Sequence, residues 1–500
     1  MSFLKKLAGE TALYGISSIL GRVLNFLLVP LYVRTLPSEE YGEVTYFYAF
    51  AAFFNVLYTF GLETTYFRFA NKDLKQEPRI FHQTFTSVAF IGLLFSVSLI
   101  WAAHPLAEWT DYSQAVSIIR WLAIIFLVDA IVAIPFARLR LQGKAKAFAA
   151  IRLINVAVNI GLNLFFLVLC PYVDENGGVL QPLVSLVYRP DYGVEYIFIS
   201  NLIANLLYLP LLGRTLMQVR IHWNWQDIKP QLVYAYPLVI MMLAGVTNEM
   251  LSRIMLNHYL PEDFYDTLTR KQAVGVFGAC YKLSVFMNLG IQAFRYAAEP
   301  FFFSRQQSAD SKQEFGMIMD WFMVVGVLVF VGISLHLEWL GPLVLGKAEY
   351  LEGLNVVPVL LLASLFLGIY FNLSIWFKLS DKNQFGTAIS LGGALLTVVL
   401  NAYLIPLKGF EGSAWVTLVV YVLMSLACYG FGQRYYPIPY NMLFLGLVLL
   451  LGVGIVLVFQ QFAISNWFLR TAVNSLGILL FLLGVWILRK LKLGLRALSA

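Results

Sequence analysis

The sequence predicts an all-α integral membrane protein with about fourteen transmembrane helices, and three observations support this fold class. Of the 500 residues, 60% are hydrophobic and 13% are charged, whereas about 25% are charged in a typical soluble protein. Apolar stretches long enough to cross a bilayer recur along the whole chain. The loops between them are short and leave no room for an extramembrane catalytic domain, so we do not expect an enzyme.

A window of about 20 mostly apolar residues, moved along the sequence, identifies fourteen candidate spans. They cover residues 11–33, 43–66, 81–103, 117–138, 148–170, 192–213, 231–256, 274–296, 317–336, 356–377, 386–405, 412–432, 441–459 and 468–488. The first span follows two lysines, but its apolar run is too long for a signal peptide, so we expect it to remain uncleaved. Met442–Phe459 contains only apolar residues and glycine. Polar residues blur the ends of the second and seventh spans.

The positively charged residues give the spans a direction. With the N-terminus inside, 24 of the 35 Lys and Arg residues fall on the inside, 7 outside and 4 within spans. Because cytoplasmic loops are enriched in Lys and Arg, both termini are predicted to lie in the cytoplasm. The formal charge of +7 is therefore a topology signal, and it does not require nucleic acid as a partner.

Two segments resemble each other at a constant offset of 238 in the numbering, RLRLQGKAKAFAAIRLINVAVNIGLNLFFL (138–167) and WFKLSDKNQFGTAISLGGALLTVVLNAYLI (376–405). An earlier pair, LYVRTLPSEE (31–40) and LNHYLPEDFY (256–265), matches at an offset of 224. Duplicated halves are common in transporters. We therefore expect a lobe of six spans over 1–220 and a second over 221–436. Residues 437–500 then form two extra helices and a basic cytoplasmic tail.

Charged residues within the spans are the main candidates for function, because a charge at the bilayer centre is costly unless it faces protein or water. Arg22, Arg253 and Lys282 would give a cavity between the lobes a positive charge, which suits phosphate or pyrophosphate. Glu249 and Arg253 are also spaced so that they could neutralise each other. Arg68 and Arg295, near the cytoplasmic ends of their spans, are either first contacts for the ligand or ordinary membrane anchors.

Three carboxylates accompany these cations. Glu63, Asp129 and Glu249 are candidates for coupling to a proton or Na⁺ gradient, and pairing with a nearby arginine is the alternative for each. The five histidines are dispersed and the three cysteines show no metal-ligand spacing, so no metal site is expected. No Gly-rich phosphate loop of the Walker type occurs, which argues against ATP hydrolysis. No cofactor is expected.

Several stretches resemble bacterial polysaccharide transporters, the Wzx-type flippases of the MOP superfamily, which also contains the MATE exporters and the lipid II flippases. The likeness is carried by GETALYGISSILGRVLNFLLVPLYVRTLPSEEYGEVTYFYAF and GLETTYFRFANK, and by QAFRYAAEPFFFSR and FKLSDKNQFG in the second lobe. It extends over essentially the whole chain, although its motifs are diffuse. Arg22 stands where the family has a cavity arginine, whereas Lys282 replaces an arginine of the lipid II flippases.

This resemblance implies a V-shaped, MATE-like bundle that moves an undecaprenyl-pyrophosphate oligosaccharide to the outer leaflet of the bacterial cytoplasmic membrane. It also implies that the two extra helices form a groove for the lipid tail. Membrane lipids and other polysaccharide-synthesis proteins are the expected partners. A MATE-like exporter of small cations is the alternative, but it would require mainly acidic cavity residues. A membrane polymerase or ligase would require larger outer loops.

Overall fold

The computed structural model describes residues 20–498 except 22, 25, 74, 113–114, 306–307, 309 and 463–465. Within these residues every regular element is a helix and no strand is present. The helices form two compact units, one of residues 1–258 and 265–275, the other of residues 259–264 and 276–500. The lobe boundaries predicted near residues 220 and 436 stay a prediction.

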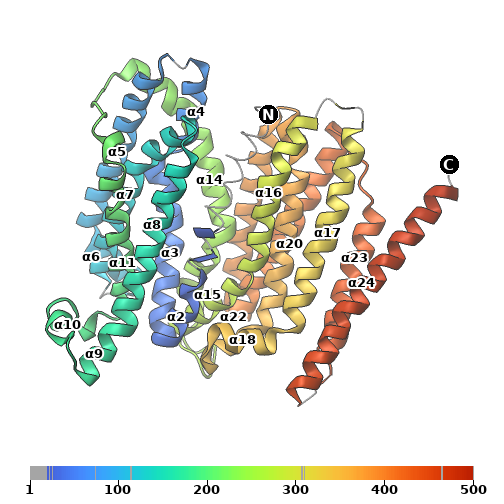
Figure 1. The fold of residues 1–500 in the computed structure, drawn as a ribbon. Coiled ribbons are helices and arrows are strands. Elements are labelled where there is room, and N and C mark those ends of the chain that lie inside the picture. Colours follow the sequence, from blue (N-terminus) through green and yellow to red (C-terminus); the bar gives the residue numbers. More distant parts are fainter. Residues whose placement is uncertain are drawn as a thin grey trace. The chain divides into compact units, whose positions relative to one another are not determined.

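Unit 1 contains the helices that cover the first half of the chain (Figure 1). They are α2 (Leu28–Thr35), α3 (Ser38–Thr59), α4 (Leu62–Lys72), α5 (Glu77–Trp101), α6 (Ala103–Trp109), α7 (Val116–Leu141), α8 (Ala145–Leu164), η1 (Phe165–Leu169), α9 (Cys170–Asn176), α10 (Gln181–Val187), η2 (Pro190–Tyr192), α11 (Glu195–Leu206), α12 (Tyr208–Leu211), α13 (Gly213–Leu216) and α14 (Trp225–Tyr259). Helix α15 (Arg270–Leu283) begins in this unit and continues into the second.

Unit 2 contains the remaining helices. They are α16 (Val285–Arg305), α17 (Ser311–Leu335), α18 (Leu337–Leu345), α19 (Ala348–Leu351), η3 (Leu354–Val356), α20 (Val357–Leu373), α21 (Ile375–Leu379), α22 (Asn383–Tyr435), α23 (Met442–Phe459) and α24 (Trp467–Leu498). Helix α22 is two helices joined at Gly409, whose non-helical backbone (φ 54°, ψ −140°) marks the break.

The described residues include ten helices that are long and apolar enough to cross a membrane, or eleven if the bent pair α15 and α16 is one span. These helices confirm the predicted all-α membrane fold. The 53-residue α22 covers the two spans predicted at 386–405 and 412–432. The apolar helix Glu195–Leu211 is shorter than the span predicted at 192–213, and most of the first span lies outside the described residues. The number fourteen therefore stays a prediction.

The two units repeat the same turn and the same helix hydrogen bond, as the offset of 238 predicts. Gly143 (φ 67°) and Asp381 (φ 55°) both adopt left-handed backbone. In the next position the amide of Lys144 donates to the Leu139 carbonyl at 2.9 Å, and that of Lys382 donates to the Phe377 carbonyl at 2.8 Å.

Further along each copy, one asparagine binds the carbonyl one turn before it. Asn163 Nδ2 donates to Asn159 O and Asn401 Nδ2 donates to Thr397 O, each at 2.8 Å. The internal repeat is therefore visible in the hydrogen bonding as well as in the sequence.

Helices α23 and α24 pack against α17 within unit 2 (Figure 1). Asn474 Nδ2 of α24 donates to the Leu335 carbonyl of α17 at 2.5 Å, and Arg470 forms an ion pair with Glu338. Further along α24, the Arg489 guanidinium lies 3.6 Å from the centre of the Trp321 ring. Helix α24 is thus fastened to the second unit at widely separated points.

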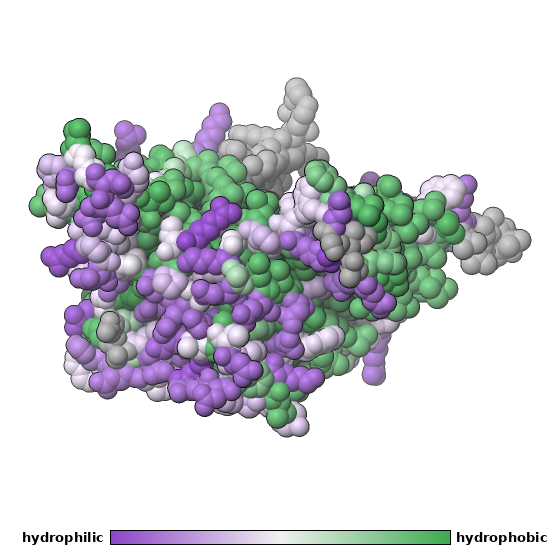
Figure 2. All heavy atoms as spheres, turned by 90° about the horizontal axis from the view of Figure 1, so that it is seen from below, coloured by the Kyte–Doolittle hydropathy of each residue, from purple (hydrophilic) through white to green (hydrophobic). Residues whose placement is uncertain are grey.

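Figure 2 shows how polarity is distributed over the lower helix ends of Figure 1. Hydrophilic side chains gather over many of these ends, and hydrophobic side chains are exposed beside them. Large apolar residues such as Leu94, Leu395 and Leu450 are more than half exposed. Such a surface is unsuited to water and suits a lipid environment.

The contact between α23 and α17 depends on a glycine. A Cβ at Gly452 would collide with Val327 Cγ1 and lie 3.3 Å from Val331 Cγ2, whereas a Cβ at Gly454 would meet nothing within 4 Å. Because overpacking costs about 1–3 kcal/mol, we expect Gly452→Ala to lower the thermal unfolding midpoint in detergent. The matched control Gly454→Ala should unfold like the natural protein. Equal midpoints for the two variants would contradict the packing described here.

Candidate functional site

Arg253 is the buried cation that the sequence singled out on α14. It is 6% exposed, and its Nη1 donates to the Glu249 backbone oxygen at 3.1 Å and lies 2.7 Å from Met250 Sδ. In this contact Arg253 binds the backbone of Glu249. Glu249 is an exposed residue. The Nη1 group of the guanidinium therefore has a hydrogen-bond acceptor on α14, the helix to which Arg253 belongs.

The other two predicted phosphate ligands lie elsewhere. Arg22 lies outside the described residues. Lys282 is exposed at the end of α15, next to Ser284, where α15 and α16 meet at an angle of 43°. Arg253 belongs to unit 1 and Lys282 to unit 2, so their convergence on one phosphate group stays a prediction.

Glu63 lies in an ion pair at the start of α4. Its carboxylate contacts the Arg140 guanidinium of α7, and Arg140 also lies 4.9 Å from the centre of the Phe67 ring. Arg68, further along α4, is exposed and stacks on Tyr234 of α14 at 4.1 Å. Charge pairing is therefore the observed state of Glu63.

The second unit contains the repeat mate of this ion pair. Lys378 Nζ, which the offset of 238 aligns with Arg140, lies 2.7 Å from Glu299 Oε1 of α16. Arg295 approaches the same carboxylate at 3.6 Å and stacks on Phe371 at 4.1 Å. In each unit, a cation three residues before the repeated left-handed turn pairs with a glutamate of an earlier helix. The pairs are Arg140 with Glu63 and Lys378 with Glu299.

A further ion pair, between Glu77 and Arg138, was missed by sequence reasoning. Arg138 Nε lies 3.0 Å from Glu77 Oε1, and the two side chains are only 11% and 13% exposed. The Tyr66 hydroxyl donates to Glu77 at 2.5 Å, and the Arg138 guanidinium lies 4.2 Å from the centre of the Phe81 ring. The partners belong to the separate helices α5 and α7, so no local spacing signalled them.

Asp129 lies in the middle of the 26-residue helix α7 and joins three helices of unit 1. Asn205 Nδ2 of α11 donates to Asp129 Oδ1 at 3.0 Å, and Asn155 Nδ2 of α8 donates to Asn205 Oδ1 at 2.9 Å. Arg152, one turn before Asn155, stacks on Phe136 at 4.7 Å. The carboxylate is thus held by an amide chain midway along an apolar helix, where an unpartnered charge would be costly in a membrane.

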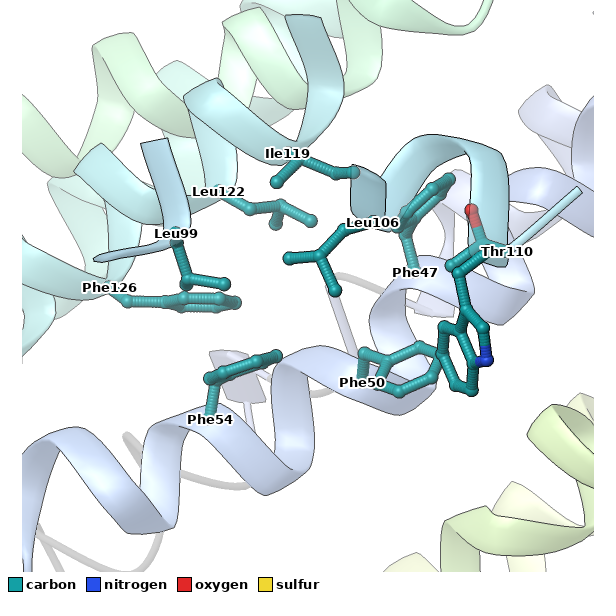
Figure 3. A pocket seen from close by; sticks show the side chains of 10 residues that line it. Phe47, Phe50, Phe54, Leu99, Leu106, Thr110, Ile119, Leu122 and Phe126 are labelled. Atoms are coloured by element: carbon teal, nitrogen blue, oxygen red, sulfur yellow. The ribbon is translucent and has the colours of Figure 1, made fainter. Parts of the chain in front are cut away.

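One pocket of unit 1 is lined by α3, α5, α6 and α7 and has a volume of about 470 Å³ (Figure 3). Aromatic and aliphatic side chains make up its wall: Phe47, Phe50, Phe54, Leu99, Leu106, Trp109, Ile119, Leu122 and Phe126. The remaining lining residue, Thr110, turns its hydroxyl to the Ala107 carbonyl at 3.0 Å. This pocket suits hydrocarbon and offers nothing to a phosphate.

A second apolar pocket lies in unit 2 beside the extra helices. It has a volume of about 630 Å³ and is lined by residues of α17, α20, α22 and α23, among them Met323, Phe366, Tyr429 and Leu445. Among the residues that the structure describes, no three His, Cys, Asp or Glu side chains are grouped so that they could hold a metal ion.

Comparison with solved structures places this fold. The structure of the lipid II flippase MurJ in an inward closed conformation matches with a TM-score of 0.73 at 13% identity, over 96% of this chain and 100% of that one. An inward-facing multidrug resistance MATE transporter of the MOP superfamily matches with a TM-score of 0.65 at 12% identity, over 83% and 94%. A mutant of the Vibrio cholerae MATE transporter VcmN matches with a TM-score of 0.58 at 14% identity, over 86% and 96%.

The apolar spans define a multi-pass membrane protein, and its fold is the one seen in the MurJ and MATE structures. A family model described as polysaccharide biosynthesis protein matches residues 7–306, more than half of the chain. The chain therefore belongs to the polysaccharide biosynthesis protein family. A comparison with curated protein sequences finds no match.

The buried Glu77–Arg138 pair gives a stability prediction. Glu77→Gln leaves the Arg138 charge without this carboxylate, and breaking a buried pair costs about 3 kcal/mol. The matched control is Asp111→Asn, because Asp111 is 57% exposed in its pair with Arg270 and exposed pairs contribute about 0–1 kcal/mol. Denaturant titration in mixed micelles measures both free energies of unfolding, and equal losses would contradict the prediction.

Proposed function

We propose that this protein is a Wzx-type flippase. In this proposal it moves undecaprenyl-pyrophosphate-linked oligosaccharide from the cytoplasmic to the outer leaflet for cell-surface polysaccharide synthesis. The observation that carries the proposal is the match of residues 7–306 to the polysaccharide biosynthesis family, joined to the fold of a lipid II flippase. The membrane is then the bacterial cytoplasmic membrane, with both termini inside.

The extent of the structural likeness supports a flippase over an exporter. The MurJ match covers 96% of this chain, and the part left uncovered is shorter than the 32 residues of α24. The likeness therefore includes part of α24. The MATE match covers 83% of this chain, and the part left uncovered is long enough to contain α23 and α24 together. A MATE-like, cation-coupled exporter is the second candidate.

Charge also supports an anionic ligand. The three proposed pyrophosphate ligands, Arg22, Arg253 and Lys282, are cations, and the guanidinium fork of arginine suits phosphate oxygens. Arg68 and Arg295 are proposed first contacts at the cytoplasmic side. A cationic drug would be repelled by this set. The ligand would bind from the cytoplasmic side and leave after the units rock to open outward, so that access alternates between the two leaflets.

The lipid tail needs an apolar path beside this charged site. The pocket between α23 and the helices α17, α20 and α22 provides an apolar wall, which supports a role in tail binding for the first of the two extra helices. Partners beyond membrane lipids, such as other polysaccharide-synthesis proteins, remain part of the proposal.

Translocation in proteoliposomes tests the phosphate ligands. We expect the natural protein to move a polyprenyl-pyrophosphate oligosaccharide between leaflets, and Arg22→Ala and Lys282→Ala each to lower the rate at least about tenfold, because a charge-assisted phosphate contact is worth roughly 1.4 kcal/mol or more. Lys408→Ala is the matched control, because it removes an exposed lysine of α22. Normal rates in both cavity variants would overturn this ligand set. No translocation by the natural protein under a pH or Na⁺ gradient would favour the exporter.

Asp129 is our proposed coupling residue. Its mid-membrane depth and its amide partner favour a carboxyl that exchanges a proton or Na⁺ during transport. Arg152 is a charged group near it, and Tyr208 lies beside Arg152. We expect Asp129→Asn to keep gradient-free exchange of the lipid while losing acceleration by a pH or Na⁺ gradient. An Asp129→Asn variant that responds to both gradients like the natural protein would assign Asp129 a purely structural role.

A further inference from the structure

The segment that links α8 to α11 carries an unusual amount of exposed apolar surface. Helix α9 and helix α10 are joined by residues 177–180 and form a hairpin at the edge of unit 1 (Figure 1). Six large side chains of this α9–α10 hairpin, residues 170–187, are exposed: Tyr172 (64%), Val179 (98%), Leu180 (44%), Leu183 (52%), Leu186 (82%) and Val187 (43%). Between Glu175 and Arg189 the sequence has no charged residue.

Helix α10 is amphipathic and firmly placed. Leu183, Leu186 and Val187 lie on one side at helical spacing, whereas Gln181 and Ser185 lie on the other. Val184 is 1% exposed and fixes the helix to the unit. The exposed apolar side is therefore presented by an ordered helix.

The C-terminal end of the hairpin is fixed by tyrosines. The Tyr188 ring stacks on Tyr196 with centroids 5.4 Å apart and an interplanar angle of 18°. The Arg189 amide donates to the Tyr196 hydroxyl at 2.5 Å. At the other end, Gly177 (φ 72°) and Gly178 (φ 130°) allow the chain to reverse sharply after α9.

The helix that leads into the hairpin indicates its height in the membrane. α8, η1 and α9 form one continuous helix over Ala145–Asn176. Its large exposed side chains from Ile154 to Tyr172 are apolar, and 18 residues of helix rise about 27 Å, close to the hydrocarbon thickness. Exposed Asp174, Glu175 and Asn176 follow at once. The hydrocarbon boundary thus falls near Tyr172, a residue type enriched at that level.

Helix α10 must lie close to the same level. Five Cα–Cα steps separate Asn176 from Gln181 and can span at most about 18 Å, so α10 begins near the end of α9. Its exposed apolar side therefore lies close to the level at which the apolar surface of the preceding span ends, and Tyr172 and Tyr188 flank the hairpin in the sequence. An amphipathic helix that lies at this depth with its apolar side toward the acyl chains has the character of an interfacial segment.

We propose that the α9–α10 hairpin is a membrane anchor whose apolar side inserts into the outer leaflet at the boundary of headgroups and acyl chains. The leaflet follows from the predicted orientation of the spans. Its occupant is the phospholipid surface itself. The hairpin fixes the height of unit 1 in the outer leaflet, independently of whether the transported molecule is a lipid-linked sugar or a soluble cation.

Spin-label accessibility in the full-length protein tests this anchor. The variant Leu186→Cys is labelled and reconstituted into phosphatidylethanolamine–phosphatidylglycerol vesicles, and its collisions with oxygen and with a water-soluble nickel chelate are measured. Ser185→Cys, on the polar side of the same helix, is the matched control, and Leu164→Cys, 48% exposed on α8, is the lipid reference. The three natural cysteines are buried, and labelled unsubstituted protein gives the background.

We expect the oxygen-to-nickel ratio at Leu186 to approach that at Leu164 and to exceed that at Ser185 several-fold. A ratio at Leu186 equal to that at Ser185 would place the hairpin in water, overturn the anchor and leave its apolar side for a protein partner. Inaccessibility to both reagents would also overturn it. In a second measurement, Leu183→Asn with Leu186→Asn should lower the ratio reported from Val179→Cys several-fold. An unchanged ratio there would mean that α10 does not hold the hairpin in lipid.

Discussion

The cost of a charge in hydrocarbon determines where this chain places its ionic groups. Glu63 with Arg140, Glu299 with Lys378, and Glu77 with Arg138 are each held within one unit and near helix ends. Pairing lets a helix that must end at the membrane surface keep its charges there without exposing them to acyl chains. The phenylalanine rings that lie against Arg138 and Arg140 extend the same protection.

The same constraint distinguishes structural charges from candidate functional ones. A charged side chain that forms an ion pair with a neighbouring helix, such as Arg138, stabilises the unit. Arg253 also has contacts on its own helix, with the Glu249 backbone oxygen and with Met250 Sδ. These contacts travel with α14, so they keep the guanidinium in place if the helix moves during transport. Asp129 lies midway along α7 and is held by a neutral amide, as suits the charge-changing role proposed for it.

The spans could be predicted from the sequence because their signal is local: about 20 apolar residues and a bias in Lys and Arg are visible without any tertiary contact. The repeat was also predictable, because its two segments align at a constant offset in the sequence. The left-handed turn shared by Gly143 and Asp381 was not predicted and is seen in the structure. The partners of the charges were not, because Glu63 and Arg140 lie on separate helices, as do Asn205 and Asp129. The spacing of Glu249 and Arg253 suggested a pair between their side chains. In the structure the Arg253 guanidinium donates to the backbone oxygen of Glu249, which lies one helical turn away.

The repeated turn has a consequence for how the two halves of the chain differ. Left-handed backbone costs glycine nothing, whereas it costs an L-residue about 1–2 kcal/mol, with aspartate among the more tolerant. The first unit meets this demand with Gly143 and the second with Asp381. The duplicated turn therefore preserves a backbone shape that two different residues fulfil at different energetic cost, so the two units are related in geometry without being interchangeable in stability.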